Sequence, residues 1–344
     1  NTEVKMNIIT FGEIMLRLAP EGYLRFEQAD KFEASFGGGE ANVAVSCAHF
    51  GHNCHFVSKL PHNSIAESAI RTLRQEGVKT EFIKRGGDRI GIYYLEKGAS
   101  QRPSQVIYDR ANSAIACANL DDFDFDEIFD GQDWFHITGI TVALSSTLKE
   151  LSLNAVKKAK EKGLKVSCDL NYRKKLWSQE EAQSAMSLLM PYVDVLIANE
   201  EDAENVFGIK ARDTEVSLGH MNENAYVDVA KQIQNRFHIQ DIAITLRTSK
   251  SANENIWSAM LYNLDKAYFA QSYNLHVIDR VGGGDSFAAG LIHAYSKKFD
   301  PQSIVNFATA ASALKHSIIG DFNHVYEKEV MTLMSGDGTG RVVR

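Results

Sequence analysis

The residues of this chain best suited to chemistry are three glycines followed by an aspartate, Gly282-Gly283-Gly284-Asp285. Glycines let successive main-chain N–H groups point at one anion, and the positive end of a helix dipole strengthens such a site. Asp285 is placed to accept a proton from a hydroxyl while the amides hold a phosphoryl group. The alternative is an aspartate that caps a helix after a glycine turn. A helix is expected here because apolar residues recur at helical spacing, namely Phe287, Ala288, Leu291, Ile292 and Tyr295.

A second glycine run, Gly37-Gly38-Gly39, lies near the other end of the chain and also precedes an expected helix. Bare glycine backbone allows a polyol to approach closely, and Asn42, one turn into the helix, offers both a donor and an acceptor to hydroxyls. The alternative is a tight turn followed by an ordinary helical asparagine.

With both runs in this order and most of the chain between them, the sequence resembles the ribokinase-like (PfkB) family of carbohydrate kinases from Ile8 to about Asp321. The resemblance implies that Gly37, Gly38 and Asn42 bind the sugar. It also implies that residues 282–284 form an anion hole and that Asp285 is the catalytic base. ATP and Mg²⁺ are the cofactors it implies, and it leaves a requirement for a monovalent cation such as K⁺ open.

Four further stretches, 11–18, 108–114, 169–173 and 314–321, are similar to the subgroup that acts on 2-keto-3-deoxygluconate. That resemblance implies ATP-dependent phosphorylation of the terminal hydroxyl, giving 2-keto-3-deoxy-6-phosphogluconate. The alternatives are a fructokinase, a 5-dehydro-2-deoxygluconokinase, or a catalytically silent sugar-binding protein. Asp285 argues against the last, because a binding module needs no base beside an anion hole.

Two arginines, Arg110 and Arg173, are candidates for the carboxylate of a sugar acid, because a guanidinium matches a carboxylate in shape and charge. Each follows an expected strand, and open α/β sheets bind ligands at the carboxyl ends of their strands. A solvated or ion-paired surface arginine is the alternative for each. Tyr94 and Tyr108 resemble the substrate tyrosines of the subgroup, although tyrosines in half-exposed strands are mostly packing residues.

The assignment of residues to the nucleotide and to the metal depends mainly on the resemblance to the family. The family's Asn-x-x-Glu motif, which holds the water shell of Mg²⁺, corresponds to residues 199–202, with Asp in the last position. Either Asp202 reaches the metal through water, or Glu200 or Glu201 substitutes, or the segment is an acidic helix N-terminus. Residues 246–251 contain no glycine where relatives have a phosphate-binding loop, so either Arg247 and Thr248 contact phosphates through their side chains or the segment is a solvent-exposed loop. The residues that the resemblance assigns to ATP and Mg²⁺ are Asn199, Asp202, Thr245, Arg247 and Thr309.

Two other nucleotide-binding classes are excluded by their motifs. A dinucleotide-dependent dehydrogenase needs G-x-G-x-x-G after the first strand, whereas Gly12 is followed by Glu-Ile-Met-Leu-Arg. A Walker-type ATPase needs a Gly-Lys pair, which does not occur in the chain.

Composition indicates one large α/β domain spanning residues 1–344, since 44% of the residues are hydrophobic. No run approaches the ~18 apolar residues of a membrane helix, and a net charge of −7 without long basic runs gives no reason to expect nucleic acid. The four cysteines, Cys47, Cys54, Cys117 and Cys168, lie in apolar contexts and are expected to be reduced and structural. The polar start argues against a signal peptide, so the cytoplasm is the expected compartment.

Short apolar runs alternate with helical patterns, which predicts a doubly wound, mostly parallel sheet flanked by helices. The expected strands are 6–11, 54–60, 133–138, 164–170, 193–198 and 241–246, and the expected helices are 64–76, 146–162, 179–190, 223–237 and 302–317. Residues 14–36 and 88–113 break this alternation, and in the family such segments form a small β-sheet lid. Lid strands with too few neighbours predict a homodimer or a higher homo-oligomer that pairs through the lid.

Overall fold

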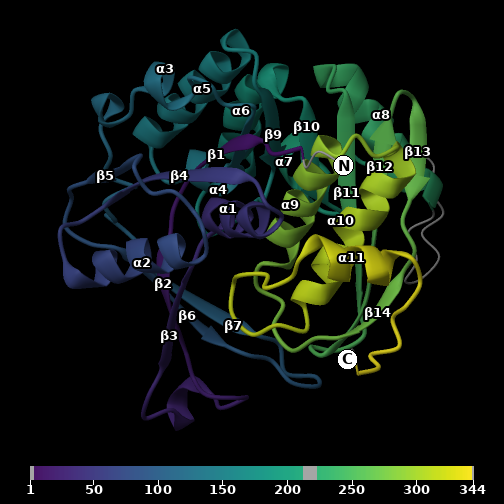
Figure 1. Cartoon of the computed structure of the whole chain (residues 1–344), viewed down its shortest axis with the longest axis horizontal. Helices are drawn as coiled ribbons and strands as arrows, with labels where there is room; N and C mark the ends of the chain where they lie inside the picture. The colour runs from purple at the N-terminus through teal and green to yellow at the C-terminus, as the bar shows by residue number, and fades with distance from the viewer. Residues whose placement is uncertain (1–3, 212–222, 343–344) are drawn as a thin grey trace.

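A mostly parallel β-sheet with helices on both faces forms the centre of the molecule (Figure 1). The computed structural model describes residues 4–211 and 223–342. The strand order is β13-β12-β11-β10-β9-β8-β1-β4-β5, and β14 also pairs with β12. The pairs from β11 to β5 are parallel, whereas β12 pairs antiparallel with β11, β13 and β14. The predicted fold class is therefore confirmed.

Six strands of this sheet were predicted and begin within two residues of their expected positions, whereas the strands at residues 83–85, 254–263, 266–269 and 273–276 were not predicted. The described residues form ten strands in this sheet. They are β1 (Asn7–Phe11), β4 (Asn53–Leu60), β5 (Ile83–Arg85), β8 (Trp134–Thr138), β9 (Lys165–Asp169), β10 (Val195–Asn199), β11 (Asp241–Ser249), β12 (Glu254–Asn263), β13 (Lys266–Phe269) and β14 (Tyr273–His276). One difference concerns residues 246–249, which were expected in a loop. They continue β11, because β12 folds back along them and Arg247 lies opposite Trp257.

The helices cover the two faces of the sheet with separate apolar cores. One layer contains α1 (Gly39–His49), α2 (Ser64–Gln75), α9 (Gly283–Ser296), α10 (Pro301–Lys315) and α11 (Glu327–Met334). The other contains α3 (Phe125–Ile128), α4 (Gly139–Ala143), α5 (Ser146–Glu161), α6 (Gln179–Leu189), α7 (Asp202–Phe207) and α8 (Glu223–Phe237). Short 3-10 helices occupy Phe26–Gln28, Leu120–Asp122 and Met190–Tyr192. Neighbouring strand residues alternate between the two cores, as Ile8 and Ile9 do.

Close packing of α9 on α10 depends on a glycine. A Cβ atom at Gly290 would lie 2.8 Å from the Cα atom of Ala308. The start of α10 is well defined, because Asp300 accepts a hydrogen bond from the N–H of Ser303 and Pro301 occupies the first helical position. The end of α10 lies next to the beginning of α9, where the hydroxyl of Ser312 donates to the main-chain oxygen of Gly283.

A separate sheet with the order β3-β2-β6-β7 projects from the core (Figure 1). Its strands are β2 (Met15–Ala19), β3 (Glu33–Gly37), β6 (Gly91–Glu96) and β7 (Gln105–Asp109), within the segments predicted for the lid. Met15, Tyr93 and Leu95 on one face are buried, and alternate residues such as Leu18 on the other face are half-buried. We call this sheet the lid.

Two findings concern the surface. Within residues 4–211 and 223–342, no helix is both long and apolar enough to cross a bilayer. Cys117 is exposed, whereas the other three cysteines are buried. The expectation of an apolar setting was therefore wrong for Cys117.

Candidate active site

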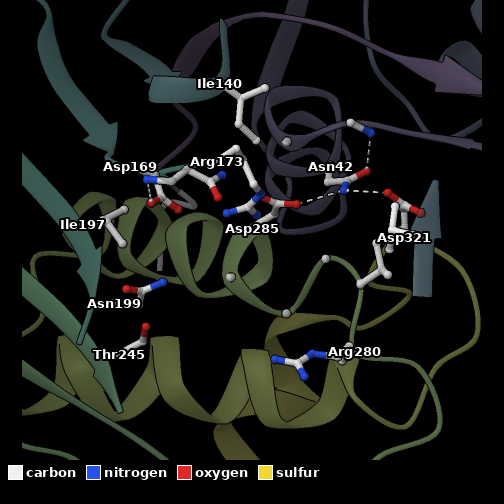
Figure 2. A pocket seen from close by; sticks show the side chains of 18 of the residues that line it. Asn42, Ile140, Asp169, Arg173, Ile197, Asn199, Thr245, Arg280, Asp285 and Asp321 are labelled. Carbon is white, nitrogen blue, oxygen red and sulfur yellow. Dashed lines mark hydrogen bonds between the residues drawn. The ribbon is translucent and has the colours of Figure 1, made fainter. Parts of the chain in front are cut away.

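The lid, the carboxyl ends of the parallel strands and the beginnings of α1 and α9 enclose a cavity of about 670 Å³ (Figure 2). This volume is typical of sites for small-molecule ligands. Asp169 at the end of β9, Asn199 at the end of β10 and Thr245 on β11 lie on neighbouring strands. The predicted site residues that line the cavity are Gly38, Asn42, Tyr108, Arg110, Arg173, Asn199, Asp202, Thr245, Arg247, Gly282, Gly283, Gly284 and Asp285.

Two of the three glycines at the beginning of α9, Gly282 and Gly283, are required by contacts with neighbouring residues. Gly282 has a φ of +84°, in the left-handed region, and a Cβ atom there would lie 2.2 Å from the main-chain oxygen of Asp321. A Cβ atom at Gly283 would lie 2.7 Å from the imidazole of His316. Gly284 has no neighbour within 4 Å of a Cβ position, so it leaves room for a ligand.

Two of the N–H groups at the beginning of α9 are available to an anion. The N–H of Gly283 donates to the main-chain oxygen of Arg280 at 3.2 Å and is therefore used by the chain itself. Among the described residues, the N–H groups of Gly284 and Asp285 have no acceptor. The candidate anion site is therefore the first turn of α9, with the free N–H groups of Gly284 and Asp285, and not the amides of all three glycines, because that of Gly283 is engaged.

Asn42 connects the two glycine runs (Figure 2). Its amide nitrogen donates to Asp285 at 2.9 Å and to Asp321 at 3.1 Å, and its oxygen accepts from the N–H of Gly38 at 3.3 Å. Gly38 itself is required, because a Cβ atom there would lie 2.0 Å from the main-chain oxygen of Glu13. Chain segments 243 positions apart are thereby joined at the carboxylate of Asp285.

The carboxyl group of Asp285 has a pKa raised to about 6. Burial is the main cause, because it disfavours the charged form, and the charge of Asp321 acts in the same direction. The hydrogen bond from Asn42 and the positive charges of Arg173 and Lys315 lower the pKa in part. A carboxylate with this pKa is ionised near neutral pH and is basic enough to accept a proton.

Arg110 lies in the cavity with unused donors. It is 9% exposed, and its Nε and Nη2 atoms have no hydrogen-bond partner among the described residues. Its guanidinium lies over the ring of Tyr108, 4.6 Å from the centroid, and its Nε atom is 3.5 Å from Glu13. Burial raises the pKa of Glu13, and the charge of Arg110 opposes that shift. A ligand carboxylate would satisfy the free donors of Arg110.

Arg173 is more exposed than Arg110, and its charge acts on three acidic groups. Its positive charge lowers the pKa of Asp169, Asp202 and Asp285, although burial raises the pKa of each overall. The charge of Asp202 also raises the pKa of Asp169. This part of the cavity therefore attracts cations.

A further part of the cavity is positively charged. The guanidinium of Arg247 donates to Asn255 and contacts Nε2 of His316, each at 2.8 Å, and lies over Trp257. Burial and the nearby charge of Arg280 lower the pKa of Arg247 to about 9. Burial and Arg173 lower the pKa of Arg280. Like charges held close together in this way favour a bound polyanion.

Residues 199–202 form a helix cap. The Oδ1 atom of Asn199 accepts hydrogen bonds from the N–H groups of Glu201 and Asp202 at 2.9 Å, and Asp202 accepts from the N–H of Asn199 at 3.0 Å. Asp202 also accepts from the N–H of Tyr172 at 3.3 Å. The oxygen of Asn199 is thus already engaged, and Asp202 is the residue of this segment with a buried carboxylate.

Three predicted residues do not line the cavity. Tyr94 is on the other face of the lid and packs against Phe32, because successive strand residues point to opposite faces; the lid tyrosines in the cavity are Tyr93 and Tyr108. Thr309 is completely buried, and its hydroxyl donates to the main-chain oxygen of Val305 within α10. Gly37 lies behind the cavity, where a Cβ atom would overlap the carboxylate of Asp321.

Sequence reasoning assigned no role to a buried ion cluster beneath the cavity. Arg17 of β2 is 2.5 Å from Asp279 and 3.2 Å from Asp321, and the hydroxyl of Tyr93 donates to Asp321. The cluster ties the lid to the segment that leads into α9. The alternation of residues in β2 could have indicated this cluster, because it places Arg17 on the same buried face as Met15. A buried arginine needs acidic partners.

The chain is similar to known carbohydrate kinases along most of its length. A model of the pfkB family of carbohydrate kinases matches residues 5–321. A 2-dehydro-3-deoxygalactonokinase of Haloferax volcanii is 30% identical, over 97% of this chain and 98% of that protein. A 2-dehydro-3-deoxygluconokinase of Thermoproteus tenax is 26% identical, over 93% and 91%. The crystal structure of a 2-dehydro-3-deoxygluconokinase from Thermotoga maritima is similar with a TM-score of 0.92 and 49% identity, covering 96% of this chain and 99% of that one.

Proposed function

Because this chain belongs to the pfkB family of carbohydrate kinases, we propose that it transfers the γ-phosphoryl group of ATP to the terminal hydroxyl of 2-dehydro-3-deoxygluconate, which is also called 2-keto-3-deoxygluconate. The products are ADP and the 6-phosphate of the sugar acid. Relatives from Thermoproteus and Thermotoga with this name support the substrate. The single observation that carries the chemistry is the carboxylate of Asp285, held by Asn42 beside the free N–H groups at the beginning of α9.

In the proposed reaction, the hydroxyl oxygen of the sugar forms a bond to the γ-phosphorus, and Asp285 accepts the proton of that hydroxyl. The bond between the γ-phosphorus and the oxygen that bridges it to the β-phosphate breaks, which releases ADP. The negative charge on the transferred group is stabilised by the N–H groups of Gly284 and Asp285 and by the helix dipole. Arg247 and Arg280 face the polyphosphate. Thr245 of β11, which lies beside Asn199 at the end of β10, is assigned to the nucleotide as well.

The carboxylate of the substrate is assigned to Arg110 and Arg173. Arg110 supports this assignment most directly, because its buried Nε and Nη2 atoms have no hydrogen-bond partner among the described residues. Tyr108 supports the orientation of Arg110 through the ring contact. A neutral sugar would leave these donors unsatisfied, so the pocket favours an acid over fructose.

Mg²⁺ fits the acidic part of the cavity. Burial raises the pKa of Asp169 and of Asp202, the charge of Asp202 raises the pKa of Asp169 further, and a divalent cation would favour the ionised form of both carboxyl groups. We assign these two carboxylates to the metal, directly or through its water shell. When bound with ATP, Mg²⁺ neutralises charge on the phosphates and orients them.

The test is ATP-dependent phosphorylation measured with purified protein across sugar acids and neutral sugars. The panel contains 2-dehydro-3-deoxygluconate, its C4 epimer 2-dehydro-3-deoxygalactonate, 5-dehydro-2-deoxygluconate and fructose. We expect the highest kcat/KM for 2-dehydro-3-deoxygluconate. The epimer is the second candidate, because the relative from Haloferax is named for it. Preference for fructose would contradict the proposal, and no turnover on any sugar would favour a binding protein.

A further inference from the structure

Lys315, the last residue of α10, is a buried lysine that has no role in the reaction proposed above. Its side chain has an exposed fraction of 0%, and its Nζ atom donates to the main-chain oxygens of Ile318 at 2.8 Å and Asp279 at 3.3 Å. Among the described residues, no carboxylate lies within ion-pair distance of Nζ. The ammonium is therefore held by carbonyl dipoles, and its charge is not cancelled by a directly bound acid.

The ammonium lies directly behind the anion site. A Cβ atom at Gly282 would be 3.4 Å from Cε of Lys315, so the side chain touches the turn that leads into α9. Asp279, which supplies one of the two carbonyls, precedes that turn by three positions. The next residue, His316, packs on Gly283 and contacts Arg247. The end of α10 thus supports the anion site from the side opposite to the cavity.

We propose that Lys315 is a positioning residue for phosphoryl transfer, whose ammonium serves as a fixed cation behind the anion site. It holds the carbonyl of Asp279 and the turn at Gly282 in the conformation that points the N–H groups of Gly284 and Asp285 into the cavity. It also adds positive potential where negative charge accumulates. A cation held by main-chain carbonyls is the arrangement expected of bound K⁺, so the lysine makes an exchangeable monovalent cation unnecessary. This inference rests on the proposed kinase function.

Charged groups face the ammonium from every element packed against it. Asp279 precedes α9, Asp285 belongs to α9, Asp321 follows α10, and these three acids raise the pKa of Lys315. Burial is the largest influence and lowers the pKa, as does Arg17 of β2, and the result is a pKa of about 8. Turnover should therefore decline as the pH rises through about 8, because the neutral amine supplies no charge.

A purely structural role predicts a different pattern. Lysines near helix C-termini often bind the last carbonyls and stabilise the helix. In that case, replacement would lower the melting temperature without a specific effect on kcat. It would also leave the response to monovalent cations unchanged. The two roles are distinguishable by kinetics in buffers free of alkali metal ions.

The experiment compares the wild type with Lys315→Met, Lys315→Arg and, as a control, Lys328→Met at an exposed position of α11. Turnover is measured with ATP, Mg²⁺ and the sugar acid in tetramethylammonium buffer, with and without KCl. For Lys315→Met we expect a kcat lower by roughly 10–100-fold, less than the loss of a direct oxyanion donor. KM for the sugar acid should change little, and KCl should restore part of kcat. The wild type and the Lys328→Met control should not respond to KCl.

Three outcomes overturn the inference: an unchanged kcat in Lys315→Met, a wild type that needs KCl, or a loss of kcat in Lys315→Met that KCl does not restore. If Lys315→Met does not fold, Lys315→Arg decides the question. The arginine stays charged, so the decline of kcat above about pH 8 should disappear, and its persistence would contradict the inference. Wild-type turnover tests the proposed function independently, since the role of Lys315 is read from ratios to the wild type.

Discussion

The pKa of Asp285, which is raised by its surroundings in the cavity, determines the pH dependence expected of the enzyme. Because the proposed base must be ionised, we expect kcat/KM for the sugar acid to rise with pH and to level off above the raised pKa of about 6.

Asp285→Asn removes the proton acceptor and should lower kcat by about 10²–10⁴-fold while sugar binding persists. Steady-state kinetics and isothermal titration calorimetry measure the two effects. Near wild-type turnover in the variant would show that Asp285 is not the base.

Arg110 and Arg173 are the residues that should distinguish acids from neutral sugars. A charge-assisted, partly desolvated pair is worth about 1.5–3 kcal/mol, so Arg110→Met and Arg173→Ala should each raise KM for the sugar acid by roughly 10–100-fold. Arg89→Met is the matched control, because Arg89 pairs with Asp109 at the lid edge outside the cavity lining. Equal losses on fructose and on the sugar acid would disprove the carboxylate role.

At the level of elements, α1 begins with a carboxylate buried against α4. Glu40 is 1% exposed and accepts hydrogen bonds from the N–H and hydroxyl of Thr138 and from the hydroxyl of Thr141. Burial nevertheless raises its pKa from 4.5 to about 7. Since the folded state binds this proton more tightly than the unfolded state, the contribution of Glu40 to stability falls as pH rises from about 4.5 to 7.

Glu40→Gln should remove that dependence, because the amide keeps an oxygen acceptor and carries no charge. Relative to the wild type, its free energy of unfolding should increase between pH 4.5 and 7 by an amount on the order of 3 kcal/mol. Denaturant unfolding at several pH values measures the difference. Glu150→Gln, at an exposed position of α5, is the control and should follow the wild type. A constant difference between Glu40→Gln and the wild type would contradict the predicted linkage.

On the scale of the whole molecule, the lid has an apolar outer face that its own chain leaves half-buried or exposed. It consists of Leu16, Leu18, Ile92, Tyr94 and Ile107. We propose that this face pairs with the lid of a second subunit, which would cover both the apolar side chains and the strand edges. Leu18→Lys should shift the mass in light scattering to that of a monomer. Leu188→Lys, at an exposed site on α6, should not. A monomeric wild type would refute the pairing.

The lid is also expected to close over the sugar, since exclusion of water prevents loss of the phosphoryl group to hydrolysis. Hydrogen exchange with and without the sugar acid measures this closure. Protection should increase in β2, β6 and β7, and α5 on the outside of the core should change little. Unchanged exchange in the lid at saturating sugar acid would rule out closure.

Much of the architecture followed from the sequence, because it depends on local patterns. Apolar periodicity predicted the strands of the parallel sheet and the helices between them, and the two departures from that period predicted the lid. The two glycine runs indicated where the main chain must carry no side chain, so that a ligand or a neighbouring segment can approach it closely. They also indicated that Asn42 and Asp285 lie in the first turns of helices, and the resemblance to the family implied that both belong to the sugar-binding and catalytic site, which the shared cavity supports.

The partner of each side chain was decided only by the tertiary structure. Tyr93, and not Tyr94, faces the cavity, because the choice depends on which face of the lid meets the core. Residues 246–249 are strand and not loop, because β12 pairs with them. The contacts of Arg17 with Asp279 and Asp321 span 262 and 304 positions, and Lys315 lies behind the anion site through packing of α10 on α9. Local spacing determines helices and strands, whereas burial of a charge beside a distant partner depends on the packing of the entire chain.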